Sequence, residues 1–83
     1  MYKILIVEDD LEMQKLLVDY LRQSGMEVMA TDSPNTALEW IKSKGGFHLA
    51  VLDIMLPEMD GLELCQKMRK ISDIPIIMSS ARA

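Results

Sequence analysis

The chain has 83 residues, of which 49% are hydrophobic and 27% charged, and this composition is typical of one globular domain over residues 1–83. Acidic residues outnumber basic ones 13 to 9, and the formal net charge of −4 argues against a nucleic-acid-binding or anionic-membrane surface. A single cysteine cannot form an internal disulfide, and no apolar run reaches the ~18 residues of a membrane span. We therefore expect a cytoplasmic domain that binds neither nucleic acid nor membrane.

The first part of the chain predicts a strand, a helix and a second strand. Residues 3–7 form a continuous aliphatic run, which is typical of a strand covered on both faces. Residues 27–31 are less apolar, which favours a strand at the edge of a sheet. Between these runs, an amphipathic helix ending near Gly25 is indicated by apolar residues at helical spacing, namely Met13, Leu16, Leu17, Tyr20 and Leu21.

A second helix and a third strand follow. Ser33 supplies an N-cap and Pro34 suits the first helical position, so a helix is expected to begin here. Gly45 and Gly46 end this helix. Residues 49–52 are all apolar and predict another buried strand.

The remaining residues predict a third helix and a fourth strand. Asp60 and Glu63 have the spacing of a capping box, which marks a helix start. Residues 74–78 form an apolar strand with a proline near its beginning. The apolar face of the helix is expected to comprise Leu64, Cys65, Met68 and Ile71.

Strands and helices therefore alternate as β-α-β-α-β-α-β. Alternation of this kind predicts an α/β fold, with a parallel sheet, right-handed crossovers and helices on both faces. In such a sheet the carboxyl ends of all strands meet at one edge, where open α/β sheets bind ligands.

Polar side chains follow three of the predicted strands at this edge. Glu8-Asp9-Asp10, Asp53 and Ser79-Ser80 each come directly after an apolar run. Neighbouring carboxylates repel each other unless a cation lies among them, and oxygen ligands with open positions suit Mg²⁺. Beside a cation, an aspartate can act as a nucleophile toward a phosphoryl group, and a serine hydroxyl can donate to that group. The alternative for an acid after a strand is a helix N-cap.

Three segments carry a family resemblance. Residues 4–10, 52–61 and 75–81 read ILIVEDD, LDIMLPEMDG and PIIMSSA, and their order and spacing resemble the receiver domain of bacterial response regulators. The resemblance implies a flavodoxin-like fold, in which four strands and three helices are present of the usual five and five. It also implies a phosphoacceptor in two-component signalling, a phosphorelay protein and not a turnover enzyme.

The resemblance assigns a role to each site residue. Asp53 is implied as the phosphoacceptor, taking its phosphoryl group from a sensor histidine kinase or a phosphotransfer protein. Mg²⁺ is implied to bind Glu8, Asp9, Asp53 and the backbone carbonyl of Met55. Further matches are the switch hydroxyl Ser80, the small residue Ala81 that leaves room for the phosphoryl group, the variable Arg82, and the turn residues Pro57 and Gly61.

The resemblance covers about the first two-thirds of a receiver. The family places a lysine at the end of a fifth strand to pair with the phosphate, whereas the lysines here are at 3, 15, 42, 44, 67 and 70. We therefore expect a receiver truncated after its fourth strand, naturally or by design, with impaired phosphorylation. We also expect self-association through the unpaired edge of residues 76–78.

Two other functions remain open. A structural or assembly fragment that associates without signalling is favoured by the missing lysine. An aspartate-nucleophile phosphatase of the haloacid-dehalogenase type uses similar chemistry, but it needs Asp-x-Asp after its first strand, and neither Glu8-Asp9-Asp10 nor Asp53-Ile54-Met55 has that pattern. A flavin-binding relative is disfavoured because its phosphate loop would be rich in Gly, Ser and Thr.

Overall fold

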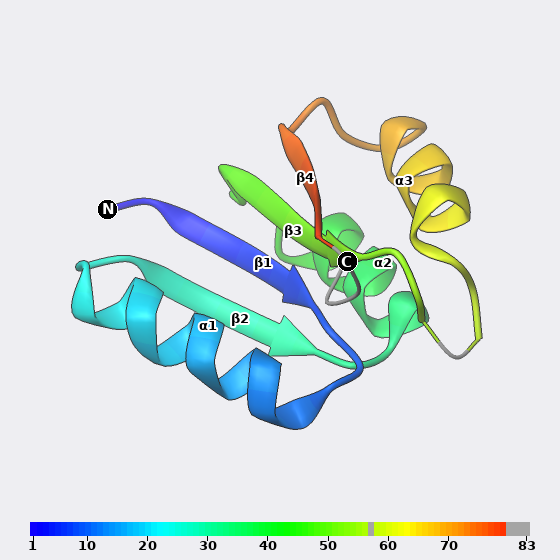
Figure 1. Cartoon of the computed structure of the whole chain (residues 1–83). Helices are drawn as coiled ribbons and strands as arrows, with labels where there is room; N and C mark the ends of the chain where they lie inside the picture. Colours follow the sequence, from blue (N-terminus) through cyan, green and yellow to red (C-terminus); the bar gives the residue numbers. More distant parts are fainter. Residues whose placement is uncertain (57, 80–83) are drawn as a thin grey trace.

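A computed structural model of the chain describes residues 1–56 and 58–79. It confirms all seven predicted elements and their alternation (Figure 1). Their bounds are β1 Lys3–Val7, α1 Leu11–Gln23, β2 Glu27–Thr31, α2 Pro34–Ser43, β3 Leu49–Asp53, α3 Gly61–Arg69 and β4 Ile76–Ser79.

The four strands form one parallel sheet in the order β2-β1-β3-β4. β2 lies at one edge, as its weaker hydrophobicity predicted, and β4 lies at the other (Figure 1). In the register, Val7 is opposite Leu52 and Asp53 is opposite Ser79. The residues that follow β1 and those that end β3 and β4 therefore lie side by side.

Helices on both faces of the sheet enclose two apolar clusters. On the face of α2 and α3, the side chains of Leu5, Leu52, Leu64 and Met68 are fully buried. On the face of α1, the cluster is smaller and centres on Ile4, Ile6 and Val28, with partly buried partners that include Leu17, Val18 and Leu21. The site edge is therefore supported by a well-packed layer on one face and a thinner one on the other.

Two parts of the predicted apolar faces are wrong. In α1, Leu16 is 66% exposed and Tyr20 is 69% exposed, because the sheet is contacted by the neighbouring row of Leu17 and Leu21. Ile71 does not belong to α3, which ends at Arg69, and its side chain is 40% exposed.

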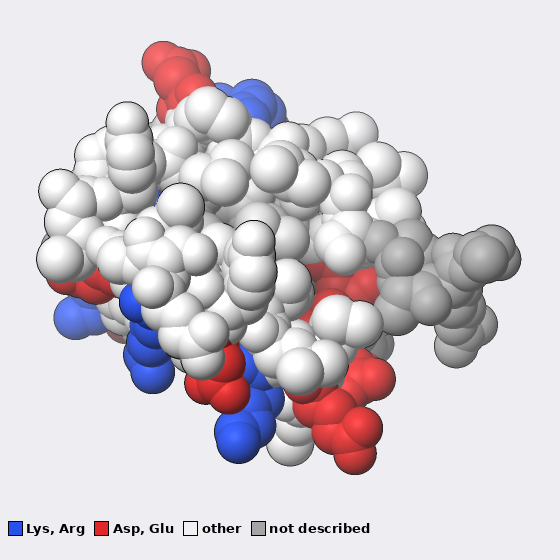
Figure 2. Space-filling view, turned by 60° about the vertical axis from the view of Figure 1, so that its left-hand side comes forward, with Lys and Arg blue, Asp and Glu red and all other residues white. Residues whose placement is uncertain are grey.

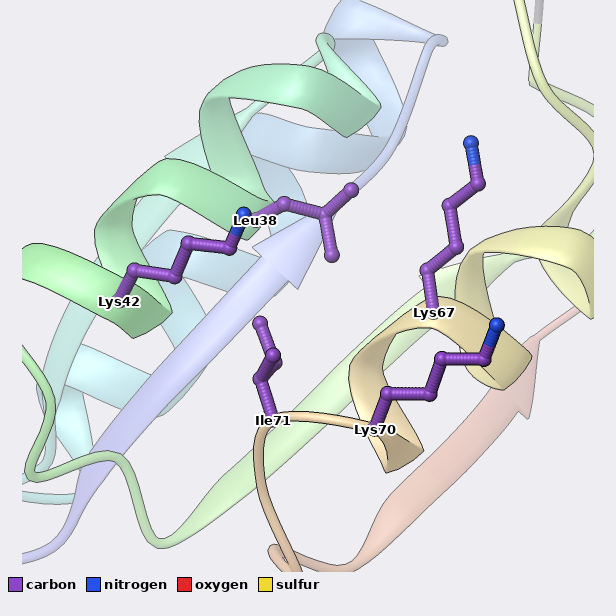
Figure 3. Close-up of a pocket in the computed structure, with 5 residues that line it drawn as sticks. All are labelled: Leu38, Lys42, Lys67, Lys70 and Ile71. Carbon is purple, nitrogen blue, oxygen red and sulfur yellow. The ribbon is translucent and has the colours of Figure 1, made fainter.

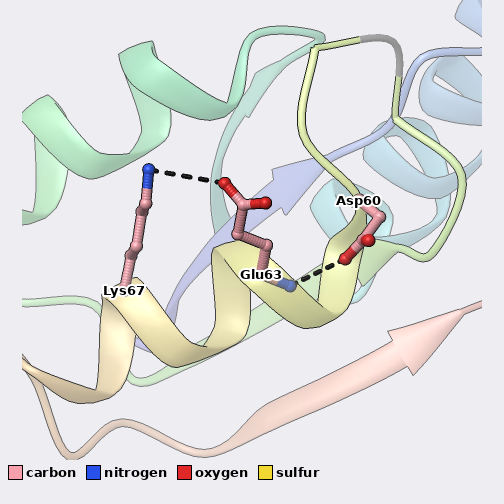
Figure 4. Close-up of polar contacts among 3 residues, drawn as sticks. All are labelled: Asp60, Glu63 and Lys67. Carbon is pink, nitrogen blue, oxygen red and sulfur yellow. Dashed lines mark hydrogen bonds and ion pairs between the residues drawn. The ribbon is translucent and has the colours of Figure 1, made fainter.

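Side-chain caps start all three helices. Oδ1 of Asp10 accepts from the first turn of α1, and Oγ of Ser33 accepts from the backbone N–H of Thr36 in α2. Asp60 Oδ1 accepts from the backbone N–H of Glu63 at 2.8 Å, which forms one half of the expected capping box. The Glu63 carboxylate lies instead 3.5 Å from the ammonium of Lys67 (Figure 4).

The charged side chains are distributed unevenly over the surface. Figure 2 shows a face with uncharged atoms across its middle, while acidic and basic side chains lie mainly toward the margins. Among the described residues, none of the helices has the length and hydrophobicity needed to cross a membrane.

Candidate functional site

The carboxyl edge of the sheet brings two buried acids together. Glu8 directly follows β1 and Asp53 ends β3, and the pairing of Val7 with Leu52 places these acids next to each other. Glu8 is 3% exposed and Asp53 is 8% exposed. They are the buried charged residues among the described part of the chain, and burial of paired acids is costly unless something compensates their charge.

Glu8 is held by main-chain and side-chain hydrogen bonds. Its Oε2 accepts from the backbone N–H of Asp10 at 3.0 Å, and its backbone N–H donates to the Thr31 carbonyl at 3.0 Å. The Glu8 carbonyl accepts from Nε2 of Gln14 at 3.0 Å. Gln14 was missed by sequence reasoning, although its place four residues after Asp10 puts it on the same side of α1.

The environment of Glu8 raises the pKa of its carboxyl group above the ordinary value for a glutamate. Burial is the largest cause, and hydrogen bonding with Asp53 and the negative charges of Asp53 and Asp10 add to it. The hydrogen bond from the Asp10 backbone acts in the opposite direction. The pair therefore carries unfavourable charge repulsion, which a bound cation would relieve.

Asp53 is oriented by the loop that follows it. Its Oδ1 accepts from the backbone N–H of Met55 at 3.1 Å. The next residue, Ile54, donates its N–H to the Ser79 carbonyl at 3.0 Å and accepts from the N–H of Gly61 at 2.8 Å. The loop is therefore fixed between β4 and the start of α3.

Gly61 allows α3 to approach this loop closely. A Cβ atom at Gly61 would lie 2.5 Å from the Asp53 carbonyl oxygen and 2.8 Å from the Cα of Ile54. Both are backbone atoms and cannot move aside as a flexible side chain can. The glycine is thus required by space, and it lies at a position that the sequence had assigned to the turn.

The other predicted site residues are less closely placed. Asp9 is exposed, and so is the side chain of Met55 at 54%, whereas the backbone N–H of Met55 contacts Asp53. Within residues 1–56 and 58–79, no group of three or more His, Cys, Asp or Glu side chains is close enough to hold a metal ion. Ser80, Ala81, Arg82 and Pro57 lie outside the described residues.

The donor set at this edge nevertheless fits a magnesium ion. Mg²⁺ usually retains several waters and takes one or two carboxylates from the protein. Glu8 and Asp53 supply two adjacent buried carboxyl groups, and the exposed Asp9 lies directly beside Glu8 in the chain. Such a cation would neutralise the charge repulsion that adds to the effect of burial on the pKa of Glu8.

Most lysines lie near the amino ends of the strands, at the opposite end of the sheet from the acids. A helix that joins two parallel strands returns the chain from the carboxyl edge to the amino edge, so its last turn lies far from the acids. The lysines near the ends of α2 and α3 are Lys42, Lys44, Lys67 and Lys70.

The other two lysines also have local partners. Lys3 begins β1, where its Nζ donates to the Gly45 carbonyl at 3.3 Å and lies 4.6 Å from the ring centroid of Phe47. Lys15 in α1 lies 4.0 Å from the carboxylate of Asp19. Within the described part of the chain, neither lysine has a contact with the pair of buried acids.

The class of protein that this fold and site indicate is confirmed by comparison with known families. The family model of the response regulator receiver domain matches residues 4–83, and the chain therefore belongs to the response regulator receiver domain family. The flavodoxin-like receiver fold expected from the sequence is confirmed, and receiver domains are signalling domains.

Curated relatives are longer proteins. The chain is 39% identical over 82 residues to the uncharacterised transcriptional regulatory protein YrkP of Bacillus subtilis, and 40% identical over 80 residues to the transcriptional regulatory protein BaeR of Escherichia coli. These alignments cover 99% and 96% of this chain. They span 35% and 33% of the two relatives, so the chain corresponds to about a third of their length.

Solved structures agree on the fold. The response regulator TrrA of Thermotoga maritima, in complex with Mg²⁺ and BeF, has a TM-score of 0.91 and 33% identity, with coverage of 100% of this chain and 72% of that one. TrrA in complex with the histidine kinase ThkA matches with a TM-score of 0.89 and 32% identity, over 100% of this chain and 72% of that one. The BeF3-activated receiver domain of Klebsiella pneumoniae RstA has a TM-score of 0.88 and 36% identity, over 98% and 68% of the two chains.

Proposed function

We propose that Asp53 accepts a phosphoryl group from a phosphohistidine of a sensor kinase or a phosphotransfer protein. The observation that carries the proposal is the pairing of Asp53 with buried Glu8 at the carboxyl edge of a receiver sheet. The complex of TrrA with a histidine kinase supports this class of partner. The domain acts as a stoichiometric acceptor in the cytoplasm, and its net charge of −4 favours no nucleic-acid contact.

The chemistry requires one bond to form and one to break. An oxygen of the Asp53 carboxylate attacks the phosphorus, the P–N bond to the imidazole breaks, and the imidazole nitrogen retains the electron pair and takes a proton from water. The hydrogen bond from the backbone N–H of Met55 to Oδ1 would hold the carboxylate in position for this attack. The proposal also includes Ser80, as the switch hydroxyl, and Ala81, as the small residue that leaves room for the phosphoryl group.

We propose that Mg²⁺ binds through Glu8, Asp9, Asp53 and the Met55 carbonyl. When bound, it neutralises charge on the acids and on the transferring phosphoryl oxygens. The raised pKa of Glu8 and the Mg²⁺–BeF complex of TrrA support this assignment. Asp10 holds Glu8 and caps α1, and it is not assigned as a ligand.

We propose further that these 83 residues bind the metal more readily than they accept phosphate. In the described part of the chain, none of the lysines has a contact at the acidic pair, so the transferring phosphoryl group gains no ammonium partner from them. Removing one electrostatic donor of this kind typically slows a reaction by about 10²- to 10³-fold. A phosphorylation rate equal to that of a receiver carrying the lysine would contradict this part of the proposal.

The decisive experiment is intact-mass analysis after incubation with Mg²⁺ and acetyl phosphate. One phosphoryl adduct is expected in the wild type and in Asp32→Asn, a variant at another strand end of the same edge. No adduct is expected in Asp53→Asn, and excess chelator should suppress the adduct in the wild type. An adduct of equal yield in Asp53→Asn would refute the assignment.

A second candidate function is assembly through β4. β4 is an edge strand, and its Ile77 is 52% exposed. Ile77 also lines an apolar groove of about 510 Å³ together with Tyr2 and Tyr20. An unpaired apolar edge is a template for pairing with another chain, so we propose homo-oligomer formation there. Phosphorylation and assembly can be tested separately, because phosphorylation involves the carboxyl ends of the strands and assembly involves the outer side of β4.

A further inference from the structure

A second groove lies between α2 and α3, away from the acidic site. Its volume is about 320 Å³, and its lining residues are Leu38, Lys42, Lys67, Lys70 and Ile71. Figure 3 shows the side chains of Leu38 and Ile71 extending into the space between the two helices. Lys42 lies on the α2 side, whereas Lys67 and Lys70 lie on the α3 side (Figure 3).

The floor of this groove is apolar and partly open to solvent. Leu38 packs against the larger core cluster from the side of α2. Ile71 follows α3, which ends at Arg69, and its side chain is 40% exposed. A large apolar side chain that enters between Leu38 and Ile71 would remove the exposed part of both from water.

The rim of the groove is basic in an acidic protein. Three of the nine Lys and Arg residues line it, although the chain has a net charge of −4. The ammonium of Lys67 lies 3.5 Å from the Glu63 carboxylate, with side chains that are 48% and 54% exposed, and a pair so exposed to water is easily exchanged (Figure 4). Among the described residues, Lys42 and Lys70 have no acidic partner within ion-pair distance.

We propose that this groove docks an acidic peptide segment that carries one large apolar side chain between its carboxylates. The apolar side chain lies between Leu38 and Ile71, and the flanking carboxylates reach Lys42 on one side and Lys70 on the other. The volume is at the lower end of the ~300–1,000 Å³ range of ligand pockets, which suits a short segment.

The lining favours a peptide over a nucleotide. None of its five described residues is aromatic, so a base would find no stacking surface. The lysines come from two separate elements and flank the apolar floor, which matches carboxylates spaced along a peptide. The docking site is independent of Asp53 and does not rest on its phosphorylation.

Fluorescence anisotropy with labelled peptides tests the proposal. The probe is a fluorescein-labelled nonapeptide with a central leucine between glutamates, and a second peptide replaces that leucine by serine. Lys42→Glu is compared with Lys44→Glu, which makes the same charge change two residues away, at the end of the same helix and outside the groove lining. Circular dichroism establishes that both variants are folded.

The expected result is tighter binding of the leucine peptide than of the serine peptide. Lys42→Glu should weaken binding of the leucine peptide about tenfold or more, whereas Lys44→Glu should weaken it about twofold or less. Added salt should weaken binding of both peptides to every variant. Ile71→Ser should bring the two peptides to equal affinity. The proposal is refuted if the two peptides bind the wild type equally, or if both lysine variants lose the same affinity for the leucine peptide. Either result would mean that the groove attracts the peptide only through its general positive charge.

Two further outcomes would also overturn it. Displacement of the leucine peptide by a nucleotide with the same Lys42 dependence would assign the groove to a phosphate ligand. Concentration-dependent self-association that is abolished by Lys42→Glu, without peptide binding, would assign it to a second copy of this chain.

Discussion

The backbone N–H of Asp10 donates to Oε2 of Glu8 at 3.0 Å, while the Asp10 carboxylate accepts from the backbone of Glu12 and Met13. One residue therefore orients the buried acid with its main chain and starts α1 with its side chain. An acid that follows a strand can therefore cap a helix and contribute to the site at the same time. Here the two uses are divided between the backbone and the carboxylate of the same residue.

The raised pKa of Glu8 predicts a pH-dependent stability in the absence of divalent metal. At pH values between the ordinary glutamate pKa and the raised pKa of Glu8, the native state retains a proton at Glu8 that the unfolded chain has lost. This contribution is fully present below the ordinary glutamate pKa, and it is lost as pH rises through the raised pKa of Glu8. Urea unfolding at a series of pH values, with chelator present, should show this fall in unfolding free energy.

Glu8→Gln should flatten the fall and make the chain more stable at neutral pH, because it removes the charge repulsion with Asp53. Glu39→Gln, at an exposed position in α2, should retain the slope of the wild type. An unchanged slope in Glu8→Gln would show that another group is responsible.

Magnesium should raise the melting temperature through the acidic site. A ligand that binds only the native state stabilises it by about 2.7 kcal/mol at one hundred times its Kd. Asp53→Asn should lose most of this increase and Asp9→Asn a smaller part, because Asp9 is exposed and Asp53 is buried. Calorimetry with and without Mg²⁺ provides the measurement, and Asp32→Asn is the control. An undiminished increase in Asp53→Asn would place the metal elsewhere.

Gly61→Ala should destabilise the fold by about 3 kcal/mol, because its Cβ would overlap the backbone of Asp53 and Ile54. Gly25→Ala is the contrasting variant. Gly25 has a φ of 86°, but a Cβ atom added there would meet nothing within 4 Å, so only the cost of the left-handed backbone applies, about 1 kcal/mol. Chemical denaturation measures both, and equal losses would mean that the close approach is not the cause.

The start of α3 should depend on its cap more than on its ion pair. Asp60→Ala removes the acceptor for the Glu63 N–H and should cost about 1 kcal/mol of unfolding free energy. Lys67→Ala breaks an exposed pair and should cost about 0.3 kcal/mol. Thermal denaturation distinguishes these values, and a larger loss in Lys67→Ala would contradict the assignment.

The edge of β4 should control self-association. Ile77→Lys places a charge on this edge and should shift the sedimentation profile toward the monomer, since charged residues block edge-to-edge pairing. Leu16→Lys makes a similar change on exposed α1 and should leave the profile as in the wild type. A monomeric wild type at high concentration would remove the basis for assembly through β4.

The order of elements and the neighbouring acids were predictable because they depend on local patterns. Apolar runs of strand length, alternating with segments of helical period, predict a parallel sheet, and a parallel sheet brings strand ends together. The positions of Glu8 and Asp53 follow from that rule alone. The family resemblance then supplied roles for these residues, and the match over residues 4–83 confirms the family.

Side-chain burial and hydrogen-bond choices were less predictable because they depend on three-dimensional neighbours. Helical spacing placed Leu16 and Ile71 on apolar faces, but which face is covered depends on how each helix lies against the sheet. Glu63 fits two local patterns equally, and the contact with Lys67 occurs in place of the reciprocal cap. The close approach at Gly61 is visible only once the loop after Asp53 is in place.

The buried acids and most of the lysines lie at opposite ends of the strands, so these charges contribute an electric dipole along the strands. At the amino ends of the strands, Lys3 contacts the Gly45 carbonyl and the Phe47 ring. Glu8 and Asp53 lie at the carboxyl ends. In the field of an approaching protein, such a dipole experiences a torque before any surfaces touch. A cationic partner is thus turned toward the acidic edge and an anionic one toward the lysines, so that orientation is selected during diffusion, most effectively at low ionic strength.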